Sequence, residues 1–464
     1  MNEYAQRTPF PTTTGTRSMP ALQSTSTRLA EFKSAITVTL GLPPNQYRIV
    51  RSSGGVAADG VVSEGMGYGL LLAGVALSQN EAGSAEHSAA LTFGEELYTG
   101  WRRMCELSQK HACQDDPTMR CGGRRRTDGI AAKGYAPCLP SWKFDNDIES
   151  QRGTGSATDG DEDALLGLIL MLHSTSTASW PLWERTLSWT YESVRAFLRF
   201  NTVGTDVRRL PKLGSCWGGF DCNNPSYIAP AHYRAFRHFT LKFGPAFGVS
   251  NATLSAEARQ WDTLIATSYQ MLDDAQCDST GLTPNWWRPA GPVQARGHAG
   301  CNASGTPADQ FGSEAARGVW RVALDALWQP SAESSRYVGR IARHLAMQYD
   351  DANGFGALQI DRRCESVKSV HPDWIANPFM YAPLSAALLP LAGSGSASAM
   401  PPHLAERRRH ALEAIKKRLA REKIDSYYSG SWIALATATL NGGFAAACEK
   451  GILDKCGGAK VKGR

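Results

Sequence analysis

The chain has 464 residues, of which 42% are hydrophobic and 20% charged, with a formal net charge of +6. This composition is typical of a globular protein with a sizeable core, and it excludes a disordered or fibrous chain. The positive charge is too small and diffuse to indicate nucleic acid as a partner, and no apolar run is long enough to predict a membrane-spanning helix.

Hydrophobic spacing predicts helices almost throughout the chain. Around residue 265, for example, Trp261, Leu264, Ile265 and Leu272 follow the three- and four-residue intervals of a buried helical stripe. In chain order the predicted helices span residues 25–40, 64–79, 87–106, 162–173, 181–199, 229–240, 255–273, 314–328, 334–350, 380–391, 403–420 and 429–440. Twelve helices suit six hairpins, so we predict an all-α fold of the (α/α)6 toroid type, a six-hairpin barrel.

No strand-rich block or internal repeat divides the chain, so a single domain is predicted over residues 25–448. Residues 1–24 are rich in Thr, Ser and Pro and predict a flexible N-terminal tail. Residues 449–464 are rich in Lys and Gly and predict a basic C-terminal tail. A cysteine-rich insertion is predicted near residues 105–138.

The predicted helix at 64–79 begins with one carboxylate among glycines, in the segment from Ser63 to Gly69. Burial at the mouth of an apolar helix raises the pKa of a carboxyl group, which suits Glu64 to act as a general acid. The alternative is a structural role, in which Glu64 only supplies favourable negative charge behind an N-cap at Ser63.

A second group of acids, Asp159, Asp161 and Asp163, lies at the start of the next strongly apolar helix. Alternating acids also occur in calcium loops. An EF-hand loop, however, needs Gly at its sixth position and Glu at its twelfth, where this chain has Ala164 and Leu170. A plain acidic helix start therefore explains most of the charges, although it does not explain the glycine at position 160.

The helix predicted at 314–328 carries Arg317, Arg321 and Asp325 at positions i, i+4 and i+8, which we expect on one side of the helix. Two guanidinium groups would hold Asp325 ionised. An ionised Asp325 opposite a protonated Glu64 is the asymmetric pair that hydrolysis of a glycosidic bond requires. The alternative is a helix that carries only structural salt bridges.

Taken together, these segments resemble glycoside hydrolase family 8, the inverting endoglucanase, xylanase and chitosanase family. Residues 63–69 are similar to its first signature and residues 157–161 to its second. Further similar segments follow in the family's order over roughly residues 45–445: they are 141–145, 225–234, 281–286, 320–325, 427–429 and 440–442.

The resemblance implies that Glu64 is the proton donor and that Asp325 is the base that activates water. It also implies that Asp159 holds the hydroxyl groups of the sugar at the cleavage point, that Tyr227 orients the attacking water, and that Trp142 stacks beneath a sugar. Three more residues are expected to bind substrate: Trp286, Arg317 and Arg321.

We therefore expect an inverting endo-β-1,4-glucanase that acts as a monomer on a β-1,4-linked polysaccharide or oligosaccharide, without a metal or organic cofactor. Xylanase or chitosanase activity with the same residues is an alternative, and the positive net charge disfavours polycationic chitosan. A catalytically inactive toroid that binds polysaccharide is a further alternative.

Eleven cysteines are many for a reducing compartment and predict a secreted or periplasmic protein with disulfides, although residues 1–20 lack the apolar core of a signal peptide. Zinc is the rival interpretation, but no Cys-x2-Cys motif supports it. Close sequence pairs are Cys216 with Cys222, Cys277 with Cys301 and Cys448 with Cys456, while Cys105, Cys113, Cys121 and Cys138 crowd one segment and Cys364 is left over. The exact pairing stays open.

Overall fold

The structure is a computed structural model that describes residues 21–42, 46–52, 60–108, 139–220, 222–288, 291–292, 310–350, 354–355, 377–390 and 400–456. Most of the predicted cysteine-rich insertion and residues 1–20 lie outside the described residues. In the described part of the chain, no helix is both long and apolar enough to cross a membrane.

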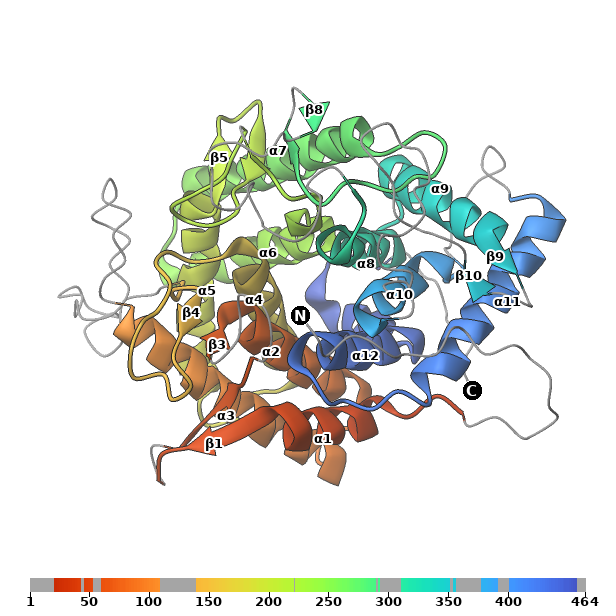
Figure 1. Ribbon diagram of the computed structural model, residues 1–464. Coiled ribbons are helices and arrows are strands. Elements are labelled where there is room, and N and C mark those ends of the chain that lie inside the picture. The colour runs from red at the N-terminus through yellow and green to blue at the C-terminus, as the bar shows by residue number, and fades with distance from the viewer. Residues whose placement is uncertain are drawn as a thin grey trace.

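Six helices of the described chain form an inner ring in which each helix packs against the next and the last packs against the first (Figure 1). Side chains on all sides of most of these helices are buried, because each helix lies between its ring neighbours and the outer layer. The inner helices are α2 (Ser63–Gln79), α4 (Thr158–Ser174), α6 (Pro230–Phe243), α8 (Ser313–Trp328), α10 (Pro378–Leu384) and α12 (Tyr427–Leu440).

An outer layer of helices surrounds this ring (Figure 1). These helices bury one stripe and expose the other, as expected for the outside of a barrel. They are α1 (Thr25–Ile36), α3 (Ala85–Leu107), α5 (Trp183–Phe200), α7 (Asn251–Ala275), α9 (Ala332–Gln348) and α11 (Pro402–Leu419). Inner and outer helices alternate along the chain, so the predicted (α/α)6 barrel is confirmed.

The helix boundaries differ from the predicted ones at a few places. The first helix ends at Ile36, because the β-branched residues that follow form strand β1 (Thr37–Leu40), which pairs with β2 (Tyr47–Val50). Helix α4 begins at Thr158, so Asp159 lies in its first turn. The helix predicted at 380–391 is a short α10 followed by a 3-10 turn, η6 (Ser385–Leu388).

Short antiparallel ribbons, none of which was predicted, connect the helices. Four ribbons follow the β1–β2 pair within the described residues, with strands of two or three residues each. They are β3 (Val61–Val62) with β4 (Lys143–Phe144), β5 (Thr202–Gly204) with β6 (Arg209–Pro211), β7 (Trp287–Arg288) with β8 (Gly291–Pro292), and β9 (Tyr349–Asp350) with β10 (Gly354–Phe355). The first of these ribbons leads directly into α2.

Helices α2 and α4 approach each other closely through glycines. A Cβ atom added to Gly67 would lie 2.6 Å from the carbonyl oxygen of Gly160, and one added to Gly74 would lie 2.6 Å from that of Gly167. In each helix the two glycines are two turns apart and therefore on one face. This contact explains the glycine at position 160 and brings the first turns of α2 and α4 side by side.

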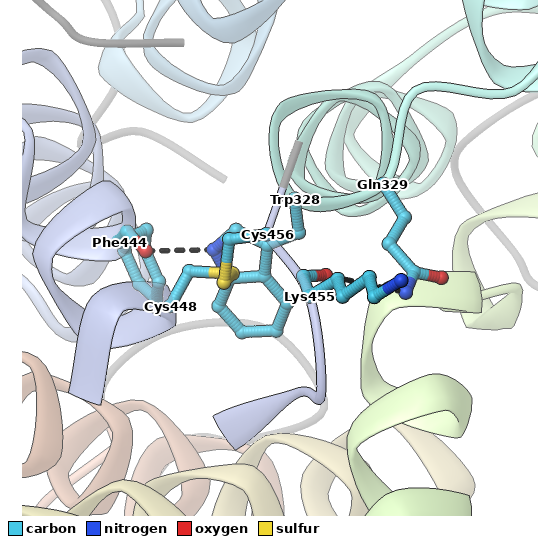
Figure 2. Close-up of a disulfide and its surroundings, with 6 residues drawn as sticks. All are labelled: Trp328, Gln329, Phe444, Cys448, Lys455 and Cys456. Atoms are coloured by element: carbon cyan, nitrogen blue, oxygen red, sulfur yellow. Dashed lines mark hydrogen bonds between the residues drawn. A yellow bond between two sulfur atoms is a disulfide. The ribbon is translucent and has the colours of Figure 1, made fainter. Parts of the chain in front are cut away.

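The far end of the ring, where the inner helices finish, is covered by residues 443–456. They form α13 (Gly443–Ala447) and a π-helical turn (Cys448–Ile452), and a disulfide joins Cys448 to Cys456. Figure 2 shows this disulfide beside Trp328 at the end of α8, whose indole Nε1 donates to the carbonyl of Phe444 at 2.6 Å. The segment from 449 to 456 is thus folded, which corrects the predicted start of the C-terminal tail.

We expect Gly67→Ala to destabilise the protein by roughly 1–3 kcal/mol, because the added methyl group would overlap the backbone of α4. Unfolding in guanidinium chloride measures this change. The matched control is Gly339→Ala in α9, where nothing lies within 4 Å of the added Cβ and a helical alanine should stabilise by about 0.5–1 kcal/mol. Equal effects of the two substitutions would contradict the close packing of α2 on α4.

Candidate active site

Glu64 is in the first turn of α2, at the end of the ring opposite the disulfide-bonded segment. The chain enters this turn from β3, and the Ser63 N–H donates to the carbonyl of Trp142 at 2.9 Å, which ties the helix start to the β3–β4 ribbon. A carboxylate is favoured here by the helix dipole. Only 16% of the Glu64 side chain is exposed.

Asp159 occupies the same place on α4 as Glu64 does on α2. Its Oδ1 accepts a hydrogen bond from the N–H of Gly160 at 2.9 Å, which fixes the carboxyl group at the helix start. The residue is 4% exposed. The glycine contact between the two helices therefore places these two acids next to each other.

Arg317, in the first half of α8, joins the acids of three helices. Its Nη1 contacts Oε1 of Glu64 and lies 2.7 Å from Oδ2 of Asp159, while its Nη2 contacts Oε2 of Glu314. The guanidinium is almost fully buried, at 2% exposure. We call Glu64, Asp159, Glu314 and Arg317 the carboxylate cluster.

The electrostatics of the carboxylate cluster favour a protonated Glu64 near neutral pH. Burial raises the pKa of Glu64 from its ordinary value of 4.5 to about 7, against the lowering effect of Arg317 and with a further rise from the negative charge of Asp159. Arg317 itself keeps its charge, because the neighbouring acids raise its pKa further above the usual range. The expected elevation of the Glu64 pKa is thus present in the structure.

Glu314 was not among the predicted site residues. It lies in the first turn of α8, its Oε2 also accepts from the Nδ2 of Asn224 at 2.9 Å, and 32% of its side chain is exposed. A signal was present, because Ser313-Glu314 repeats the pattern of Ser63-Glu64: a serine and an acid at the start of an apolar helix. The regular spacing of Arg317, Arg321 and Asp325 on the same helix instead favoured Asp325 as the base.

Asp325 is not part of the carboxylate cluster. It is fully buried, and its carboxylate accepts from Arg234 Nε at 2.8 Å and from the Tyr269 hydroxyl at 2.6 Å. Its guanidinium partner is Arg234 of α6, so the prediction that the two arginines of its own helix hold Asp325 ionised is wrong. Burial raises the pKa of Asp325, and the charge of Arg234 opposes that rise. From Arg317 to Asp325 the helix rises about 12 Å and turns by roughly 80° beyond two full turns, which explains why the two side chains meet different neighbours.

Arg321 lies beneath the carboxylate cluster and is fully buried, so it cannot contact a substrate as predicted. Its guanidinium is 2.6 Å from Asp163 Oδ2 and 3.2 Å from Glu162 Oε1, and it donates to the carbonyl of Ser226. Ser226 belongs to the 3-10 turn η4 (Pro225–Tyr227). Arg321 thus supports the backbone that carries Tyr227.

Aromatic side chains lie on the loops around the carboxylate cluster. The Tyr227 ring centroid is 5.3 Å from the guanidinium carbon of Arg317, and Trp142 is half-buried beside the start of α2. Trp286 is only 6% exposed and packs with Leu213, which makes it a poor candidate for stacking on a sugar. Trp217, which was not predicted, is more accessible and packs against the same small apolar cluster.

No group of three or more His, Cys, Asp or Glu side chains that could hold a metal ion occurs among the residues the structure describes.

Comparisons with known proteins bear on the fold and on the part of the chain from residue 133 to residue 355, which includes the second signature. The family model described as "Glycosyl hydrolases family 8" matches residues 133–355. Endoglucanase 2 of Ruminiclostridium josui is 29% identical over 213 residues, and Endoglucanase C of Ruminiclostridium cellulolyticum is 28% identical over 213 residues. Each alignment covers 44% of this chain and 38% of the relative, so the match spans about two fifths of the relatives' length.

Among solved structures, a β-1,3-1,4-glucanase from Paenibacillus sp. X4 is similar with a TM-score of 0.61, 16% identity, and coverage of 93% of this chain and 97% of that one. Rex8A from Paenibacillus barcinonensis, solved with xylose, is similar with a TM-score of 0.58, 16% identity, and coverage of 91% and 93%. These likenesses establish the fold.

Fold and site together define an α/α-barrel protein with an acidic centre at the start of its inner helices. Over residues 133–355 the chain is similar to glycoside hydrolase family 8.

The raised pKa of Glu64 predicts a stability change with pH. The folded protein holds the Glu64 proton up to about pH 7, whereas the unfolded chain releases it near 4.5, so this group's contribution to stability falls as the pH rises between those values. Glu64→Gln cannot ionise, and its unfolding free energy relative to wild type should rise by roughly 1–3 kcal/mol between pH 4 and pH 8.

Chemical unfolding at both pH values measures this difference. Glu406→Gln, on the exposed face of α11, is the control and should track wild type within about 0.5 kcal/mol. A Glu64→Gln protein with the same pH dependence as wild type would contradict the buried, protonated state of Glu64.

Proposed function

We propose that the protein is an inverting endo-β-1,4-glucanase, a hydrolase of internal bonds in β-1,4-glucan. The observation that carries this proposal is a carboxyl group with a pKa of about 7, Glu64, on the same guanidinium as a partly exposed second carboxylate, Glu314. Supporting this substrate, the relatives matched at 28–29% identity are named as endoglucanases.

Glu64 is the proposed general acid. Near pH 7 a large fraction of Glu64 carries its proton, and its side chain still reaches the surface of the site. Proton donation to the bridging oxygen lets the leaving sugar depart as an alcohol instead of an alkoxide, which accelerates such reactions by about 10²–10⁴-fold. Arg317 then stabilises the Glu64 carboxylate that remains.

Glu314 is the proposed base, in place of Asp325. A base must reach a water molecule, and Glu314 is the more exposed of the two: Asp325 is fully buried against Arg234 and Tyr269. Its Oε2 is oriented by Arg317 and Asn224, so the carboxylate is held in one place while it takes a proton from water. The water then attacks the anomeric carbon on the face opposite the leaving group.

Asp159, Tyr227 and Trp142 are the proposed sugar-binding residues. Asp159 contacts the same guanidinium as the acid and the base, where a carboxylate can accept from sugar hydroxyl groups. Tyr227 lies against Arg317, where it can orient the water, and the accessible rings of Trp142 and Trp217 suit stacking on the apolar faces of sugars.

We also propose that the protein works in an oxidising compartment. Besides the Cys448–Cys456 bond, Cys105, Cys216, Cys222 and Cys277 are disulfide-bonded. Disulfides of this number persist outside the reducing cytosol.

Xylan is the second candidate substrate. Rex8A, which was solved with xylose, and a cold-adapted family 8 xylanase share the fold with TM-scores of 0.58 and 0.59. A substrate panel distinguishes the two candidates.

We expect reducing-sugar release from carboxymethylcellulose and mixed-linkage β-glucan to exceed release from xylan and chitosan. The products should first appear in the inverted, α-anomeric form. Proton NMR during the first minutes of hydrolysis reads the anomer. Glu64→Gln should lower kcat by roughly 10²–10⁴-fold with little change in KM. Binding of glucan without hydrolysis by the wild-type protein would favour the inactive toroid, and β-anomeric first products would rule out inversion.

We expect Glu314→Gln to lower kcat by roughly 10²–10⁴-fold while the protein stays folded, since the amide cannot take a proton from water. Asp325→Asn is the comparison: it should lower the melting temperature, because it weakens a buried ion pair with Arg234. Below the unfolding transition, its kcat should stay within about threefold of wild type. A folded Asp325→Asn protein as inactive as Glu314→Gln would return the base to Asp325.

A further inference from the structure

Two tyrosines hold the carboxyl group of Glu64 from different parts of the chain. Tyr68 is one turn along α2 on the same face, and its hydroxyl donates to Oε1 of Glu64 at 2.8 Å. Tyr427 is the first residue of α12, and its hydroxyl donates to Oε2. Neither tyrosine has a role in the mechanism proposed above.

The approach of Tyr427 depends on a glycine in α2. A Cβ atom added to Gly65 would lie 3.1 Å from Cε2 of the Tyr427 ring, so a larger residue at position 65 would press on the ring. Tyr427 is itself 4% exposed and packs beside Tyr428, with ring centroids 5.9 Å apart. The residue next to Glu64 thus leaves the space in which the Tyr427 ring lies.

A carboxylate has about four positions at which it accepts hydrogens, two on each oxygen. The Tyr68 hydroxyl and the Arg317 guanidinium take up both positions of Oε1. Arginine has no acceptor, so it cannot receive a hydrogen from Glu64. Tyr427 takes up one position of Oε2. The described contacts leave one position, on Oε2, for the proton of the acid.

We propose that Tyr427 is a positioning residue for the general acid: its hydroxyl occupies one acceptor position of Glu64 Oε2 and so fixes the other as the position that carries and delivers the proton. The inference rests on the proposed function of Glu64 as the acid. In the proton transfer from Glu64, the O–H bond of Oε2 breaks and the proton binds the glycosidic oxygen. That oxygen keeps the electron pair of the broken bond to the anomeric carbon, and Glu64 is left as a carboxylate.

The hydroxyl of Tyr427 is suited to this task because it keeps its own hydrogen. Burial, and then the nearby charge of Glu64, raise the pKa of Tyr427 well above its ordinary value of 10. The same two causes raise the pKa of Tyr68. Both hydroxyls therefore stay donors over the whole range in which Glu64 titrates, and they stabilise the carboxylate more strongly than the protonated acid.

The test is the titration of Glu64 in the whole protein, labelled with [5-¹³C]glutamate and followed by carbon NMR, with the Glu64 signal assigned by its loss in Glu64→Gln. In Tyr427→Phe we expect the pKa of Glu64 to rise by about half to one unit, because a charge-assisted hydrogen bond to the ionised form is lost. The alkaline limb of the pH–rate profile should move up equally, and kcat should fall by roughly tenfold with KM little changed.

Tyr428→Phe is the matched control. Its hydroxyl is also buried, but it donates to the carbonyl of Ser313 at 2.9 Å instead of to Glu64. This variant should leave the titration of Glu64 and the alkaline limb within about 0.2 unit of wild type. If Tyr427→Phe does not fold, Gly65→Ala displaces the same ring and should move the pKa of Glu64 in the same direction by a smaller amount.

An unchanged Glu64 titration in Tyr427→Phe, or an equal shift in Tyr428→Phe, would overturn the role of Tyr427. The NMR titration does not depend on turnover. A wild-type protein that hydrolyses no glycan would therefore end the proposed function, while the titration would still decide whether Tyr427 controls the carboxyl group.

Discussion

The contact between α2 and α4 is the constraint on which the acidic centre depends. Side chains at Gly67 or Gly160 would hold the two helices apart, since the atoms they would meet belong to the opposing backbone. With glycine at these positions, the first turns of both helices lie side by side, and with them Glu64 and Asp159. Two like charges so close together are unfavourable. The buried guanidinium of Arg317 offsets that repulsion, and burial keeps the proton on Glu64.

The barrel serves this arrangement because its inner helices all begin at the same end of the ring. Each of α2, α4 and α8 carries an acid in its first turn, where the helix dipole favours negative charge. Beneath them, Arg321 neutralises further acids of α4 and holds the turn that carries Tyr227. The polar centre is thus built from short-range contacts on rigid helices, while the surrounding loops contribute the aromatic rings.

Periodicity in the sequence was enough to predict the helices and the barrel, because every helix buries a long apolar stripe. A second local pattern, an acid next to glycine before an apolar run, was enough to place Glu64 and Asp159 at the starts of buried helices. Asp325 was misread because its partners, Arg234 and Tyr269, come from other helices. Strands of two residues are too short to show an alternating pattern, and the contact of Tyr427 with Glu64 joins residues 363 positions apart.

The last inner helix closes the ring against the first, and the first outer helix contacts the segment before α12: Arg28 in α1 donates to the carbonyl of Glu422 at 2.8 Å. On the ribosome, α2 is made long before α12. The hydrogen bond from Tyr427 to Glu64 therefore cannot form until the C-terminal helices have been made. The set of hydrogen bonds around this carboxyl group is consequently completed only once synthesis of the barrel is nearly finished.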